Sequence, residues 1–99
     1  MNEPTEPTAA SGTTELPLHP RLNRRFRLQY EETQLRHVLL YPEGMVQLND
    51  TAAEILKRCK GEHTLDQIVA DLEAAFRVQG IGPQVRNLLE EGVRRGWIE

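Results

Sequence analysis

The sequence lacks the features that would place the protein outside the cytosol or on a nucleic acid. Cys59 is the single cysteine, so no internal disulfide can form, which fits a reducing compartment. No apolar run approaches the roughly 20 residues that cross a bilayer, and the N-terminus lacks the positive start and apolar stretch of a signal peptide. The formal net charge of −3 argues against nonspecific binding to nucleic acid or anionic lipid. We therefore expect a cytoplasmic protein that binds neither membranes nor nucleic acid.

The 99 residues are enough for one domain. Residues 1–15 are rich in threonine, proline and glutamate and contain no large apolar residue after Met1, which predicts disorder. Residues 16–20, Leu-Pro-Leu-His-Pro, form a stiff connector that can lie on the domain or on a neighbouring copy. We therefore predict a disordered, proline-rich tail over residues 1–20 and a folded domain over residues 21–99. A homodimer formed by exchange of the N-terminal segment is a further hypothesis.

Three strands are predicted in the first half of the domain. Residues 26–30 alternate between apolar and polar, the period of a half-buried strand. Residues 35–41 contain a continuous apolar run, which is typical of a central strand. Pro42 and Gly44 then favour a tight turn, and a third strand of about four residues follows at 45–48. In a three-stranded meander this short third strand lies at an edge.

The second half predicts three helices. Thr51 and Glu54 have the spacing of a capping box, with Asn49 and Asp50 as competing caps, and Thr64 repeats the pattern. The apolar stripes expected to face the core are Ala52, Ile55, Leu56 and Cys59, then Leu65, Ile68, Val69, Leu72 and Phe76, then Val85, Leu88, Leu89 and Val93. A three-stranded antiparallel sheet followed by three helices is an α+β fold. Short helices beside such a sheet resemble a winged helix-turn-helix.

No combination of side chains indicates catalysis. The histidines at 19, 37 and 63 lie in a connector, a strand and a turn, and none has a Cys, Asp or Glu at metal-ligand spacing. Cys59 falls on a predicted buried stripe, where a thiol is unreactive. The two glycines at 80 and 82 precede a helix but follow another helix rather than a strand. We therefore predict a protein that is not an enzyme and has no metal site.

Two binding functions are compatible with this architecture. Arginines at 21–27 and 94–95 can meet phosphates, but the helix that would enter DNA carries Glu90 and Glu91, which disfavours a DNA-binding regulator. The short edge strand instead exposes unpaired N–H and C=O groups, to which another chain can add as a strand. An edge that is blunted by its shortness or covered by the tail is the alternative. The residues alone leave these two interpretations open.

The segment at residues 39–72, LLYPEGMVQLNDTAAEILKRCKGEHTLDQIVADL, resembles the family of pyrroloquinoline quinone (PQQ) biosynthesis protein D, PqqD. The Tyr41-Pro42-Glu43-Gly44 turn followed by Leu48-Asn49 is the most specific element, and the resemblance extends over about residues 21–99. It implies a peptide chaperone, a recognition element for ribosomally made and modified peptides (RiPPs). Such a chaperone holds no cofactor, binds the precursor peptide PqqA, and presents it to the radical SAM enzyme PqqE. A recognition domain for a different modified peptide is the alternative.

The resemblance also implies where the peptide lies, as a strand added beside the third strand and resting against the third helix. The residues expected to pair through their backbone are Met45, Val46, Gln47 and Leu48. The residues expected to line the helical wall are Arg86, Leu89, Glu90 and Val93, with Arg86 able to pair with an acidic peptide. Proline at Gln47 should block pairing if that N–H points outward. If it points inward, Val46 or Leu48 is the sensitive position.

Overall fold

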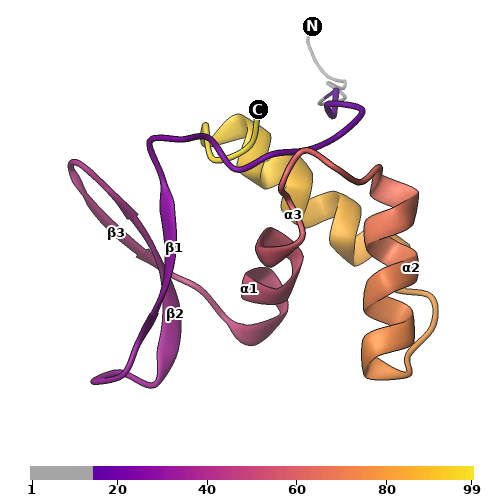
Figure 1. Ribbon diagram of the computed structural model, residues 1–99, viewed down its shortest axis with the longest axis horizontal. Coiled ribbons are helices and arrows are strands. Elements are labelled where there is room, and N and C mark those ends of the chain that lie inside the picture. The colour runs from indigo at the N-terminus through magenta and orange to yellow at the C-terminus, as the bar shows by residue number, and fades with distance from the viewer. Residues whose placement is uncertain (1–14) are drawn as a thin grey trace, which may run out of the picture.

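The structure is a computed structural model that describes residues 15–99. Figure 1 shows a small sheet on one side and three helices on the other, with the C-terminal end of the chain returning beside the N-terminal segment. The elements in chain order are β1 (Arg27–Glu31), β2 (Arg36–Tyr41), β3 (Gly44–Gln47), α1 (Asp50–Lys57), α2 (Leu65–Phe76) and α3 (Gly82–Arg94). The predicted α+β fold is confirmed. The predicted disorder before residue 15 lies outside the described residues. None of the helices within residues 15–99 has both the length and the apolar character needed to span a bilayer.

The sheet has the order β1-β2-β3 and is antiparallel throughout, so β2 is central and β3 lies at an edge, as predicted. Leu28, Leu39 and Val46 lie side by side across the three strands and face the helices. Tyr30 was expected on the same half-buried face, but it is 48% exposed and stacks edge-on against His37. The alternating pattern therefore predicted the strand correctly and overestimated the burial of its far end.

The helix starts depend on local side-chain hydrogen bonds. Asn49 caps α1, because its Oδ1 accepts a hydrogen bond from Ala52 N at 2.8 Å. The predicted capping box of Thr51 and Glu54 is wrong, since Thr51 already lies inside the first turn and the competing cap Asn49 begins the helix. The capping box of α2 is confirmed, with Thr64 Oγ1 and Gln67 Oε1 each accepting from the other residue's backbone N–H.

The core lies between the sheet and the three helices. Its fully buried centre includes Leu39 of β2, Ile55 of α1, Ile68 of α2 and Leu89 of α3. The predicted stripes supply most of this core, but Phe76 is 52% exposed because α2 ends there and the chain turns away. Trp97 and Ile98 fold back after α3 and are also buried.

The segment before β1 is held by the C-terminal end of the chain. Arg21 and Glu99 exchange backbone hydrogen bonds of 3.1 and 2.8 Å, and Leu22 N donates to Cys59 O at 3.0 Å. Pro20 is fully buried and Leu16 packs against the core. The connector that the sequence assigned to the tail therefore lies along this chain's own domain.

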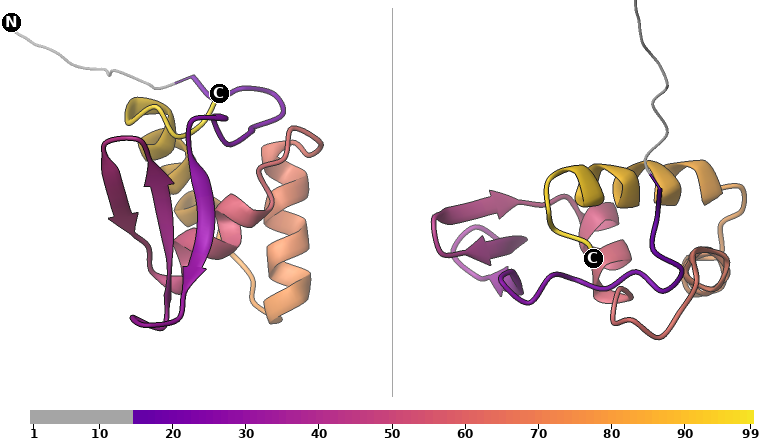
Figure 2. Two further views of the ribbon diagram at one scale, coloured as in Figure 1. Left: turned by 60° about the vertical axis from the view of Figure 1, so that its left-hand side comes forward. Right: turned by 90° about the horizontal axis from the view of Figure 1, so that it is seen from above.

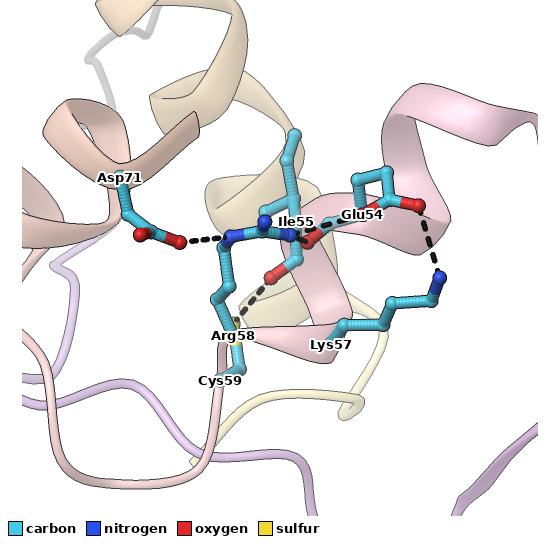
Figure 3. Close-up of polar contacts among 6 residues, drawn as sticks. All are labelled: Glu54, Ile55, Lys57, Arg58, Cys59 and Asp71. Carbon is cyan, nitrogen blue, oxygen red and sulfur yellow. Dashed lines mark hydrogen bonds and ion pairs between the residues drawn. The ribbon is translucent and has the colours of Figure 1, made fainter. Parts of the chain in front are cut away.

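A polar junction joins α1 to α2 (Figure 3). The Arg58 side chain ion-pairs with Asp71 of α2 and also donates to the backbone oxygen and the carboxylate of Glu54, at 2.8 and 3.0 Å. Burial opposes the charge of Arg58, but the hydrogen bonds that its guanidinium donates to Asp71 and Glu54 outweigh this effect and raise the pKa of Arg58. The junction therefore links the end of α1 to α2 through the side chain of Arg58.

Candidate functional site

The titratable side chains of the described region do not form a reactive group. Within residues 15–99, no three His, Cys, Asp or Glu side chains converge on a point where they could hold a metal ion. Cys59 is buried, and its Sγ donates to Ile55 O at 3.4 Å (Figure 3). Burial raises the pKa of the Cys59 thiol from 9.0 to about 12. A neutral, enclosed thiol packs as a small apolar side chain and does not act as a nucleophile.

Cys59 is accordingly expected to resist thiol reagents in the native protein. Its folded-state pKa is raised, so its contribution to stability is fully present below pH 9 and is lost as the pH rises towards about 12. At pH 8, labelling by an aromatic disulfide should be at least about 100-fold slower than in urea, because each unit of pKa shift lowers the thiolate fraction about tenfold. Absorbance of the released thiol measures the rate. Immediate stoichiometric labelling of the folded chain would contradict this burial.

The free edge of β3 is the first feature suited to binding. Leu48 N donates to His37 O at 3.0 Å, so these two residues form a hydrogen-bonded pair. Bonded and non-bonded pairs alternate along antiparallel strands. The register of β2 and β3 therefore turns the N–H of Val46 towards β2 and the N–H and C=O groups of Met45 and Gln47 outward. Of the two cases considered for Gln47, the structure therefore has the one in which its N–H points outward.

The surroundings of β3 leave room beside this edge. Within residues 15–99, β2 is the only helix or strand whose backbone runs close to the backbone of β3. In the left view of Figure 2, β3 is the outermost strand and α3 lies behind the sheet, whereas α2 lies beyond β1 on the other side. A strand added to β3 would therefore lie on the α3 side of the molecule.

A hollow of about 320 Å³ begins where β3 ends. It lies between the start of α1 and one face of α3, and its lining residues are Asn49, Thr51, Ala52, Ile55, Gln84 and Leu88. The sequence analysis missed Gln84 and Leu88 as site residues. Their spacing of four places both on one face of a helix, but this pattern does not show which structural element that face meets.

The four predicted β3 residues differ in what they expose. Met45 is 49% exposed, whereas Val46 packs against the core and Leu48 is 5% exposed. The Gln47 amide Nε2 donates to Gln34 at 2.8 Å, and its Oε1 accepts from Arg36 at 3.0 Å. Of these four residues, only Met45 and Gln47 direct backbone groups outward with no backbone partner within residues 15–99, so the pairing capacity is concentrated at these two positions.

The four predicted α3 residues do not share the hollow. Leu89 is fully buried in the core and has no surface to offer a ligand. Arg86 and Glu90 form an ion pair of 3.9 Å, and Val93 packs partly against the core. At 3.6 residues per turn, these three positions lie about 140–160° around the helix from Leu88. The hollow is lined from α3 by Gln84 and Leu88 and by none of the four predicted residues, so their role in binding stays a prediction.

Comparison with known families agrees with this architecture. Residues 36–98 match the model of the family described as coenzyme PQQ synthesis protein D, PqqD. The chain belongs to the PqqD family. The matched range runs from the start of β2 to the buried C-terminal Ile98, and so it contains β3, all three helices and the hollow.

Curated PqqD relatives align over most of their length. A protein of Methylococcus capsulatus named PqqA binding protein is 51% identical over 77 residues, which is 78% of this chain and 83% of the relative. A protein of Stutzerimonas stutzeri with the same name is 47% identical over 81 residues, covering 81% of this chain and 88% of the relative. Both relatives are thus named for binding PqqA.

A solved PqqD structure has the same fold. The solution structure of the PqqD part of Methylobacterium extorquens PqqCD superposes with a TM-score of 0.72 at 30% identity, and covers 87% of this chain and 96% of that one. That protein is described as a functional and stand-alone RiPP recognition element. The arrangement of three strands before three helices is therefore shared with a member of the family whose structure was determined by experiment.

Proposed function

We propose that this PqqD chain binds the precursor peptide PqqA along the free edge of β3 and presents it to the radical SAM enzyme PqqE. The observation that carries the proposal is the pair of outward-facing backbone positions, Met45 and Gln47, directly before an apolar hollow. The names of the relatives support the identity of the peptide.

The contacts at the β3 edge and the first hollow can be compared with the free energy that peptide binding needs. Two outward residues offer two N–H donors and two C=O acceptors, and each backbone hydrogen bond adds about 0.5–1.5 kcal/mol net. An apolar side chain buried in the hollow near Leu88 adds about 1.5–3 kcal/mol. Together these contacts supply about 3.5–9 kcal/mol before the cost of ordering a flexible peptide, so a micromolar dissociation constant, about −8 kcal/mol, requires further contacts beyond the β3 edge and this hollow.

An added strand would also leave the peptide accessible. Only one edge of the guest would pair with β3, so its other edge and its outer face would remain open to the enzyme. This arrangement suits a chaperone that passes a bound peptide to a second protein, because the enzyme need not displace the chaperone before it reaches the substrate.

An NMR titration of the labelled chain with synthetic PqqA tests the proposal. We expect the amide signals of Met45, Gln47, Thr51 and Leu88 to shift and to saturate together. The β1 edge is an internal control, because the same alternation turns Tyr30 outward there. Shifts confined to β1, with β3 unchanged at saturation, would refute the proposed edge. Omission of the chain from a PqqE reaction with PqqA should lower the yield of modified peptide.

A further inference from the structure

A second hollow lies beyond the first. It has a volume of about 360 Å³, within the range of roughly 300–1,000 Å³ usual for ligand pockets. Its walls come from the start of α1, the end of α2, the α2–α3 loop and the start of α3. The lining residues are Asp50, Thr51, Glu54, Ile55, Leu72, Phe76, Val78, Ile81, Gln84 and Val85. The site described above does not include this space.

The lining leaves apolar surface exposed. Phe76 is 52% and Val78 41% exposed, while Ile55, Leu72 and Val85 form a buried floor. Phe76 and Val78 lie on consecutive parts of the chain at the end of α2, where α2 meets the loop that leads to α3. Large apolar side chains that remain exposed beside an apolar floor gain free energy if another apolar side chain covers them.

The second hollow adjoins the first. Thr51, Ile55 and Gln84 line both of them. Gln47 and Asn49 are two residues apart, which is about 7 Å in extended chain. A guest paired with β3 therefore reaches the first hollow within about two residues of Gln47, and a few further residues bring it to Phe76 and Val78.

Two carboxylates at the rim of the second hollow, those of Glu54 and Asp50, differ in whether they already form ion pairs. The carboxylate of Glu54 already pairs with Lys57 at 2.9 Å and with Arg58 at 3.0 Å. Asp50 makes no ion pair within residues 15–99. A guest that carried a lysine or arginine here would therefore find one carboxylate available, whereas an acidic guest residue would be repelled.

We propose that the second hollow is an anchor pocket for the same guest peptide, which receives a bulky apolar side chain lying next to a lysine or arginine. The proposal rests on the proposed function, because it assigns the part of the guest that continues past the β3 edge. The apolar side chain covers Phe76 and Val78, and the neighbouring cation lies beside Asp50. The pocket thereby selects guests by sequence, which backbone pairing alone cannot do.

Calorimetry with synthetic PqqA tests the anchor pocket. Val78→Glu should weaken binding by about tenfold or more, because it places a charge among apolar side chains. Leu18→Glu is the matched control, since Leu18 is an apolar residue that is 74% exposed and lies outside the pocket. Asp50→Asn should weaken binding by about two- to fivefold, and this difference should disappear at high salt.

Alanine variants of the peptide identify the anchor. One bulky apolar residue of PqqA should be the anchor, and its replacement by alanine should weaken binding to the parent chain. The same peptide variant should bind the Val78→Glu chain no more weakly than unmodified PqqA does, because the contact is already lost. The pocket proposal is overturned if Val78→Glu binds like the parent, or if Leu18→Glu loses as much as Val78→Glu. If Gln47→Pro still weakens binding in either case, the edge proposal survives without the pocket. Thermal unfolding of each variant checks that it is folded.

Discussion

Gln47→Pro is expected to weaken PqqA binding by about 30–100-fold while the domain stays folded. Proline removes the outward N–H and places its ring where the guest carbonyl would approach, so one hydrogen bond is lost and the adjacent pairing is disturbed, together about 2–3 kcal/mol. The domain should tolerate the change, because an edge strand accepts proline where its N–H faces solvent. The register places Gln47 at such a position. Calorimetry gives the affinity, and circular dichroism confirms the fold.

Two matched variants separate the loss of the Gln47 N–H from the loss of its side chain and from the effect of a proline at the other edge of the sheet. Gln47→Ala removes the side-chain hydrogen bonds to Gln34 and Arg36 but keeps the N–H, so it should bind within about threefold of the parent. Tyr30→Pro makes the same backbone change on the opposite edge, where Tyr30 also faces outward. It should leave the affinity unchanged. Loss of binding in Tyr30→Pro alone would mean that the guest adds to β1.

Much of the fold could be predicted because it depends on patterns within single elements. The continuous apolar run in β2 and the capping box at Thr64 are local features, and both appear in the structure as expected. The exposed ends, Tyr30 and Phe76, could not be predicted in this way. An apolar period shows which face of an element turns inward, but it does not show how far the neighbouring elements extend to cover that face.

The candidate site could be predicted only in part, for a related reason. The edge position of β3 follows from strand order and strand length. The outward direction of the Met45 and Gln47 amides depends on which β3 residues form hydrogen-bonded pairs with β2. Which face of α3 meets the hollow depends on how α3 crosses α1. Helical periodicity groups Gln84 with Leu88 and Arg86 with Glu90 equally well. Only the tertiary arrangement distinguishes the two faces.

Two adjacent leucines of α3 should give opposite phenotypes. Leu89 is fully buried, and replacement of a buried leucine by alanine costs about 2–5 kcal/mol of stability. A domain of this size has only about 5–10 kcal/mol in total, so Leu89→Ala should remain folded with a much lower denaturation midpoint. Leu89→Asp, which would place a charge in the core, should not fold. It therefore cannot serve as a probe of the peptide groove.

Leu88→Ala provides the matched comparison. Leu88 is only partly buried and lines the hollow, so this variant should lose about 1 kcal/mol of stability but bind PqqA about five- to tenfold more weakly. Leu89→Ala, measured at a temperature where it is folded, should bind within about threefold of the parent. Urea unfolding gives the stability of each variant, and calorimetry gives its affinity for PqqA. If Leu89→Ala kept the parent's stability and lost affinity, Leu89 would face the peptide, as the family resemblance implies.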